Sequence, residues 1–433
     1  MTFHHDSGQR VSRRDVLQRL AGLAFGVSVH GHFGLAGLSA QAAQAQAVTP
    51  SRDVSVILLQ MRGAMSHLDT FDPKPGRAEQ GETKAIRTKT PGIQFTEHVP
   101  KLAGMSDRLA VLRAMTTETG AHEQATYLMR TSYTAINSIV HPSMGSWTLH
   151  AQGKRSKELP GFVLIGNGNE HPGAGFLDAS YTPVPVADPD RGLENTTQPA
   201  YLSDAQFRRR LSLADRIDRA FKNAHEGPQI AAYDQMYKDA TKLLGGSGLE
   251  AFDISKEPEK LKAQYGDTKF GKGCMLARRL VEAGVRCVEV ELGGWDMHRD
   301  IFADVGEKAT DLDTGMSGLL KDLGDRGMLD STLVVLATEF GRTPEVNQNA
   351  GRDHHPAVFS CVLAGAGIKG GSVYGTSDER GFRPDDDAVM VSDFNTTIAH
   401  AAGLPYTKEF SAPNGRPFKI GGGGTPIKAI LAS

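Results

Sequence analysis

The sequence predicts an α/β fold in which a mostly parallel β-sheet is flanked by helices. Short apolar runs recur along the chain, each followed by glycine or polar residues, and segments with helical periodicity separate several of them. Buried strands that alternate with helices are typical of parallel sheets, which are covered on both faces. The chain of 433 residues is long enough for one large domain or two ordinary ones.

Six apolar runs are predicted strands, at residues 54–61, 109–115, 161–166, 285–292, 332–338 and 357–365. Helices are predicted at residues 122–132, 270–283 and 309–326. The stretch at about residues 203–266 is rich in Arg, Lys, Asp and Ala with helical periodicity, which predicts a helical insertion. Residues 167–200 are rich in Gly, Pro and Asn, and we expect them to form long loops near the functional site.

The N-terminus has the pattern of an export signal. Arg13 and Arg14 form a twin-arginine pair, and residues 20–51 contain no Asp, Glu, Lys or Arg. Several A-x-A cleavage sites follow, up to Ala47. The segment resembles a bacterial Tat signal, which implies export by the Tat machinery to the periplasm or the medium. We therefore expect a signal peptide at residues 1–47 and a single mature domain at residues 48–433, with no stable membrane anchor.

Composition excludes some classes of partner and site. The formal net charge is −2, which favours neither nucleic acid nor an anionic membrane as a partner. The three cysteines show no C-x-x-C or regular spacing, so neither a zinc knuckle nor a disulfide framework is predicted. We expect the cysteines to be small buried hydrophobic residues.

Acidic and imidazole side chains lie next to three of the predicted strands. Ligands of open parallel sheets bind beyond the carboxyl ends of the strands. Carboxylate oxygens and imidazole nitrogens are ligands of divalent cations. The sequence therefore predicts a divalent metal site, for zinc, calcium, magnesium or manganese, with the ligands Asp296, His298, Glu339 and His354. Arg342, Arg352 or Arg62 could pair bidentately with an oxyanion, and in a metal-dependent hydrolase Arg342 is predicted to hold it beside the metal.

The segment that follows the second strand supplies further candidates. Thr117, Thr119 and Gly120 precede a predicted helix that begins near His122. Threonine and glycine suit a helix N-terminus, where free N–H groups bind anions such as phosphate or sulfate. Plain helix capping is the alternative for either threonine.

Several stretches together resemble the bacterial DUF1501 family of exported proteins. They are SHLDTFDPKP (66–75), HEQATYLMRTS (122–132), PSMGSW (142–147), FGKGCMLARRLVEAGVRCVEVELGGWDMH (270–298), TEFGRTPEVN (338–347) and GRDHHPAVFSCVLAGAGIKGGSVYG (351–375). That family is similar to the alkaline phosphatase–sulfatase superfamily. The resemblance implies an alkaline phosphatase-like three-layer sandwich with a helical insertion.

The resemblance also implies roles for single residues. His122 stands where the superfamily has a Cys, Ser or Thr nucleophile, and Thr117 or Thr119 could supply a hydroxyl instead. Where the superfamily has Asp-His, this chain has Glu339-Phe340, and its Asp-x-x-x-His appears here as Asp296-x-His298.

These departures leave three functions open. The first is an exported metal-dependent hydrolase of phosphate or sulfate esters, with a small anionic ester or a glycan as substrate. The second is a non-catalytic member that binds a ligand, a glycan or a protein. The third is another enzyme on the same fold, such as a phosphomutase or a lyase.

Overall fold

The computed structural model describes residues 53–193 and 247–432, together with isolated residues between 201 and 216. The predicted signal peptide at residues 1–47 lies outside the described residues, as does most of the helical insertion predicted at about residues 203–266. The described end of that insertion contains α7 (Glu259–Tyr265) and two short 3-10 helices, η4 (Ser247–Phe252) and η5 (Ile254–Lys256).

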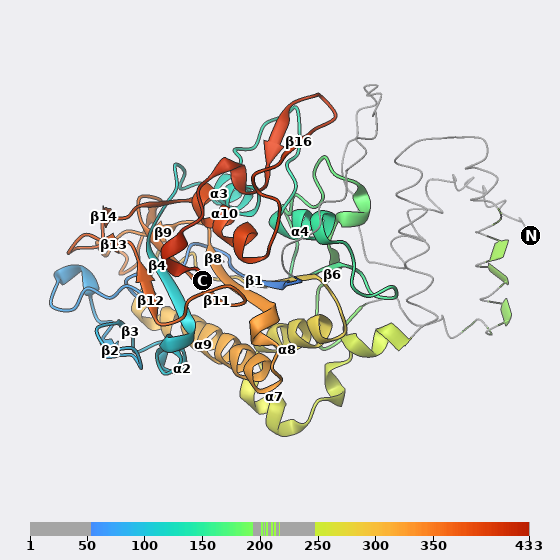
Figure 1. Cartoon of the computed structure of the whole chain (residues 1–433). Coiled ribbons are helices and arrows are strands. Elements are labelled where there is room, and N and C mark those ends of the chain that lie inside the picture. Colours follow the sequence, from blue (N-terminus) through green and yellow to red (C-terminus); the bar gives the residue numbers. More distant parts are fainter. Residues whose placement is uncertain are drawn as a thin grey trace, which may run out of the picture.

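A central β-sheet organises the fold (Figure 1). Within the described residues it has nine strands, in the order β12-β4-β11-β8-β1-β7-β5-β6, with β15 also paired with β4. Of these nine described strands, only β11 runs antiparallel to its neighbours, and the other pairings in the sheet are parallel. In sheet order the strands are β12 (Ser372–Tyr374), β4 (Leu109–Thr116), β11 (Phe359–Gly365), β8 (Thr332–Thr338), β1 (Ser55–Met61), β7 (Cys287–Leu292), β5 (Phe162–Ile165) and β6 (Val184–Val186), with β15 at Val389–Met390. The predicted mostly parallel sheet is therefore confirmed.

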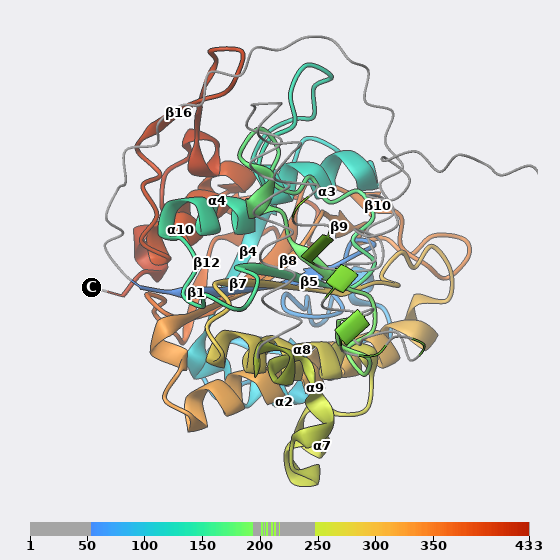
Figure 2. The same cartoon turned by 90° about the vertical axis from the view of Figure 1, so that its right-hand side faces the viewer.

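Helices cover both faces of the sheet, as Figure 2 shows. One face carries α2 (Pro100–Ala103), α8 (Lys269–Glu282) and α9 (Ile301–Asp325), and the other carries α3 (His122–Thr131), α4 (Met144–Gln152) and α10 (Val391–Ala401). The strands are apolar on both sides because alternate residues enter different cores. Ile57 and Leu59 belong to the core beneath α8 and α9, whereas Val56 belongs to the core beneath α4 and α10. The result is the predicted three-layer α/β sandwich.

The largest difference from the predicted elements is the start of α9. The helix begins at Ile301, eight residues before the predicted start at Ala309. Ile301, Val305 and Ala309 are all buried at a spacing of four residues, so the apolar stripe of the helix begins with Ile301. The short strands β6, β12 and β15 have two or three residues each, which is too few for a periodic pattern.

Among the residues that the structure describes, four small antiparallel ribbons lie outside the central sheet. They pair β2 (Ala85–Arg87) with β3 (Gln94–Thr96), β9 (Gly341–Arg342) with β10 (His354–His355), β13 (Thr376–Ser377) with β14 (Pro384–Asp386), and β16 (Glu409–Ser411) with β17 (Pro417–Lys419). The remaining 3-10 helices are η1 (Ala78–Gln80), η2 (Ser106–Arg108), η3 (Ala179–Tyr181), η6 (Leu329–Ser331), η7 (Ile420–Gly423) and η8 (Lys428–Ile430). The β9–β10 ribbon matters most for the site because it places Arg342 opposite His354.

Two further expectations concern the cysteines and the membrane. The cysteines are buried and free, as expected, at Cys274, Cys287 and Cys361. In the part of the chain that the structure describes, no helix has the length and apolar character needed to cross a membrane.

Candidate metal centre

The candidate site lies at the edge where the parallel strands end. Met61 at the end of β1 pairs with Leu292 of β7 and with Thr338 of β8, so these three strands finish in register. The segments that follow them carry Arg62, Asp296 and Glu339. The antiparallel strand β11 starts at this same edge, and His354 lies just before it. Strand β4 ends here and leads into α3, whose first residue is His122.

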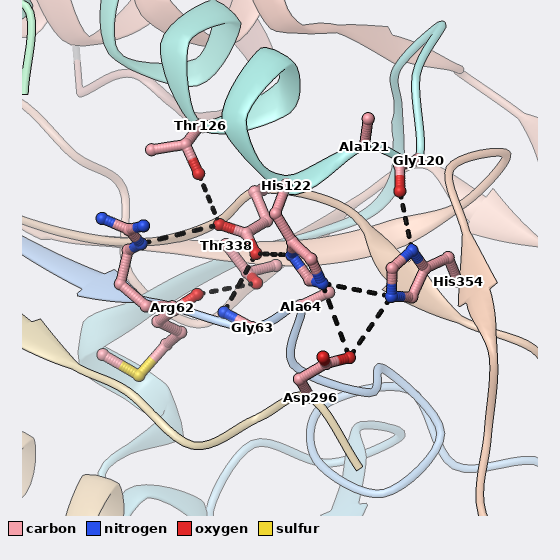
Figure 3. A network of polar contacts seen from close by, with 12 residues as sticks. Arg62, Gly63, Ala64, Gly120, Ala121, His122, Thr126, Asp296, Thr338 and His354 are labelled. Atoms are coloured by element: carbon pink, nitrogen blue, oxygen red, sulfur yellow. Dashed lines mark hydrogen bonds and ion pairs between the residues drawn. The ribbon is translucent and has the colours of Figure 1, made fainter. Parts of the chain in front are cut away.

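Three side chains bring their donor atoms together, as Figure 3 shows. The Nε2 atoms of His122 and His354 are 3.1 Å apart. Oδ1 of Asp296 is 3.2 Å from Nε2 of His354 and 3.5 Å from Nε2 of His122. Two imidazole nitrogens and one carboxylate oxygen at these separations can act as ligands of one divalent metal ion.

A fourth donor lies beside this group. Nε2 of His298 is 3.0 Å from Oδ1 of Asp296 and 3.0 Å from Nε2 of His354. Asp296 and His298 come from the segment after β7, which turns tightly because the amides of Met297 and His298 donate to the carbonyl oxygens two residues before them. The sequence prediction placed Asp296, His298 and His354 together, and in the structure their donor atoms are neighbours.

Each imidazole is fixed by an acceptor at its other ring nitrogen. Nδ1 of His354 is 2.7 Å from the carbonyl oxygen of Gly120, and Nδ1 of His298 is 2.7 Å from Oδ1 of Asp353. Nδ1 of His122 bonds with Oε1 of Glu339. Since a carbonyl oxygen only accepts, Nδ1 of His354 carries a proton, and in the neutral ring Nε2 is then the nitrogen that can bind a metal. Such outer partners orient the ligands and increase their basicity in metal sites.

Glu339 faces His122 from a buried position. Its Oε1 accepts a 2.9 Å hydrogen bond from the Gly63 amide, and its Oε2 accepts a 2.6 Å bond from the Thr126 hydroxyl. Burial acts to raise the pKa of this carboxyl, but the bonds from His122 and Thr126 lower the pKa below its usual range. The same contact raises the pKa of His122. No hydrogen bond or ion pair of the described residues joins Glu339 to Asp296 or His354, so the carboxylate acts on the centre through His122.

Arg342 lies beneath Asp296 with a side chain that is 0% exposed. Its guanidinium donates to Asp296, to the carbonyl oxygens of Gly63 (2.6 Å) and Ala64 (3.0 Å), and to that of Arg352 (3.1 Å). Burial acts to raise the pKa of Asp296, but the bond from Arg342 outweighs it and lowers the pKa to about 2. Arg342 therefore keeps Asp296 ionised and in place, and its donors are occupied by the protein itself.

The two predicted threonines have other contacts. The amide of Thr117 donates to the Pro356 carbonyl oxygen at 3.1 Å, and its hydroxyl is buried. The Thr119 hydroxyl accepts from the Ala121 amide at 3.2 Å, just before α3, and lies 3.1 Å from Oε1 of Gln124. These are contacts of the turn that leads into the helix. None of the described hydrogen bonds joins either threonine to the donor atoms of His122, Asp296 or His354.

The sequence interpretation did not connect two groups that support the centre, Asp353 and the Gly120 carbonyl, with its histidines. Asp353 precedes His354 directly in the motif GRDHHP, and this acid beside a histidine is the sequence signal that could have found it. Its contact with His298 joins two segments that are far apart in the chain. The carbonyl oxygen of Gly120 carries no side-chain signal at all. Backbone acceptors of this kind are identified only once the tertiary structure places them.

A glycine at the edge of the centre allows the chain to pack tightly against His298. A Cβ added to Gly351 would lie 2.0 Å from the carbonyl carbon of His298. We expect Gly351→Ala to displace His298 and to weaken metal binding about 10- to 100-fold, the range typical of lost outer support. Titration with a chelating competitor measures the affinity.

Gly293→Ala is the matched control for this prediction. Gly293 follows β7, and an added Cβ there meets no heavy atom within 4 Å. Equal metal affinities for the two variants would show that the close packing of Gly351 does not matter to the centre.

Three solved structures illustrate what the fold is similar to. Ps i-CgsB, solved in complex with k-i-k-neocarrahexaose, is 12% identical, with a TM-score of 0.42 over 87% of this chain and 75% of that chain. The PsFucS1 sulfatase from Pseudoalteromonas sp. is 16% identical, with a TM-score of 0.37 over 89% and 73% of the two chains. A protein in the alkaline phosphatase superfamily from Vibrio parahaemolyticus is 9% identical, with a TM-score of 0.36 over 96% and 79%.

The family assignment comes from sequence. No curated protein matches the chain. A family model does match, over residues 53–431, which is nearly all of the predicted mature domain. The chain therefore belongs to the DUF1501 family, described as a protein of unknown function.

Proposed function

We propose that this chain is an exported metal-dependent hydrolase of phosphate or sulfate esters. The observation that carries the proposal is the convergence of His122, Asp296 and His354, with His298 beside them, at the carboxyl edge of the sheet. These four side chains are 29–47% exposed. Structural metal sites are closed, whereas catalytic sites keep a position open for water or substrate. Partial exposure of all four donors therefore favours a catalytic site.

The donor set fits some of the predicted ions better than others. Three imidazole nitrogens and one carboxylate oxygen suit zinc or manganese, whereas calcium and magnesium prefer oxygen ligands. We assign His122, His298, His354 and Asp296 as ligands, and Glu339 as the group that orients His122. A divalent ion held there would polarise an ester oxygen and lower the pKa of water.

Three further groups fix the charge or the orientation of the metal ligands. Arg342 keeps Asp296 ionised, and Gly120 and Asp353 fix the imidazoles of His354 and His298. Among the described residues, no hydroxyl or thiol side chain bonds with the four donor atoms. We therefore assign the nucleophile to water, rather than to Thr117, Thr119 or the His122 ring. A small anionic ester or a glycan ester would approach from the exposed side.

The same lack of a hydroxyl beside the donors favours a second candidate function. A non-catalytic protein that binds a ligand, a glycan or another protein needs no nucleophile, and its ion would be structural. Turnover of an ester separates the two functions, since only the hydrolase releases product.

The test expresses the full-length chain and uses the mature protein recovered after export by its own signal. We expect elemental analysis to find zinc or manganese in stoichiometric amount, and we expect hydrolysis of aryl phosphates or aryl sulfates that chelation stops and the metal restores. Protein that contains no divalent metal would contradict the proposal. Metal-loaded protein that hydrolyses neither class of ester would favour the binding function. Protein retained in the cytoplasm would contradict only the export prediction.

A further inference from the structure

Arg62 differs from the other arginines near the centre because its side chain is only loosely held. Arg342 and Arg352 are 0% exposed, and each donates at short range to carboxylates and backbone carbonyls. Arg130 is also buried, where it bonds with Glu289 and Glu291. The Arg62 side chain is 24% exposed. It follows β1 directly, and the Glu339 carboxylate joins it to His122, on the side of His122 away from His354 (Figure 3).

The contacts of Arg62 are long, with one exception. Its Nη1 is 3.4 Å from the carbonyl oxygen of Asn169 and 3.4 Å from Oε1 of Glu291, and its Nε is 3.9 Å from Oε2 of Glu339. Good hydrogen bonds of this type have separations nearer 2.9 Å. Only Oε2 of Glu170, which is 3.0 Å from Nη2, has such a separation. Glu170 is therefore the main partner of Arg62.

The buried carboxylates of Glu291 and Glu339 both have hydrogen-bond donors other than Arg62. Oε1 of Glu291 accepts a 2.7 Å bond from Arg130, and its Oε2 accepts from the amides of Asn167 (2.9 Å) and Gly168 (3.2 Å). Glu339 is satisfied by His122, Thr126 and Gly63, as described above. A movement of Arg62 away from them would leave no buried carboxylate without a partner.

Glu170 is also easily displaced from Arg62. It lies in the loop after β5, its side chain is 44% exposed, and its φ of 64° falls in the left-handed region that non-glycine residues rarely adopt. Ion pairs between exposed side chains contribute little to stability. A guanidinium binds the oxygens of carboxylates and of phosphate or sulfate in the same bidentate geometry.

We propose that Arg62 is the side chain that binds the anionic group of the substrate, and that Glu170 holds this guanidinium until phosphate or sulfate oxygens replace its carboxylate. This inference rests on the proposed function and names the group that would recognise the ester as an anion. It follows from the elimination of Arg342 and Arg352, whose guanidinium groups are held by carboxylates and backbone carbonyls, and of Arg130, which is buried against Glu289 and Glu291. It also assigns a use to the loop after β5, which lies in the predicted loop region and brings Glu170 to the site. The described part of that region also contains η3 and β6, which were not predicted.

The test measures anion binding apart from turnover. Zinc-loaded full-length protein is titrated with inorganic phosphate and with inorganic sulfate by calorimetry. We expect Arg62→Met to weaken binding of the preferred anion at least tenfold and Arg62→Lys to weaken it less, with metal content unchanged. Glu170→Gln removes the competing carboxylate, so we expect it to tighten binding severalfold. Arg77 and Glu379 form an exposed ion pair on other loops, and Arg77→Met and Glu379→Gln are the controls, with unchanged anion affinity.

The outcomes separate this inference from the proposed function. Wild-type protein that binds neither anion, or an Arg62→Met variant that binds as tightly as wild type with its metal in place, would overturn the role of Arg62. If Arg62→Met does not change the KM for ester hydrolysis, the protein is a hydrolase in which Arg62 does not bind the substrate. If anion binding depends on Arg62 but the protein hydrolyses no ester, the role of Arg62 in anion binding is supported and the proposed hydrolase activity is rejected.

Discussion

Replacing His354 with alanine is expected to abolish stoichiometric metal binding. Nε2 of His354 is the donor nearest to the others, 3.1 Å from Nε2 of His122, 3.0 Å from Nε2 of His298 and 3.2 Å from Oδ1 of Asp296. Loss of an outer partner of a metal ligand typically weakens metal affinity by about 10- to 100-fold. Loss of the ligand itself should weaken metal affinity by more than this range, and ester hydrolysis should disappear with the metal. Elemental analysis after gel filtration measures the metal content.

The neighbouring histidine supplies the matched control. Nε2 of His355 is 2.6 Å from the Phe382 carbonyl oxygen, a contact outside the donor group. We expect His355→Ala to keep its metal and to lose only the stability that this one hydrogen bond contributes, about 1 kcal/mol. If the two alanine variants retained metal equally, the assignment of the centre would be wrong.

The second large effect is expected on stability, at the pair of Asp69 and Arg352. Both side chains are 0% exposed, and Nε of Arg352 is 2.8 Å from Oδ2 of Asp69. Asp69→Asn keeps the shape of the side chain but leaves the guanidinium buried without a counter-charge. Breaking a buried pair from one side costs about 3–5 kcal/mol. We expect the free energy of unfolding, measured by urea denaturation, to fall by this amount.

An exposed ion pair provides the comparison for Asp69→Asn. Oδ2 of Asp107 is 2.8 Å from Nζ of Lys89, and both side chains are exposed. Asp107→Asn should change the free energy of unfolding by less than about 1 kcal/mol. Similar losses in the two variants would mean that burial of the Asp69 pair does not determine its contribution.

The buried pair also links the SHLDTFD motif to the metal centre. The Arg352 carbonyl oxygen accepts a bond from Arg342, which in turn holds Asp296. The hydroxyls of Ser66 (2.5 Å) and Thr83 (2.7 Å) complete the bonds to Asp69. The polar residues of this motif therefore form a scaffold beneath the site, which explains why so many of them are fully buried.

Much of the fold was predictable from local patterns. The predicted strand at residues 332–338 has the bounds of β8, and the predicted strand at residues 109–115 differs from β4 by one residue. Long apolar runs such as these are buried on both faces, so their pattern is continuous and easily recognised. The start of α9 was missed because Gly306 and charged residues interrupt the stripe that Ile301 and Val305 begin.

The sequence by itself determined that Asp296, His298 and Glu339 stand after the carboxyl ends of parallel strands, which share one edge of the sheet. His354 comes before a strand, and only the structure shows that this strand, β11, is antiparallel and therefore starts at the same edge. The sequence could not decide which atoms face one another. That depends on ring orientation and on contacts between segments far apart in the chain, such as His122 with Glu339 and Gly120 with His354. Only the tertiary structure placed the His122 ring among the metal donors and committed Arg342 to Asp296, because those geometries are set by packing rather than by local sequence.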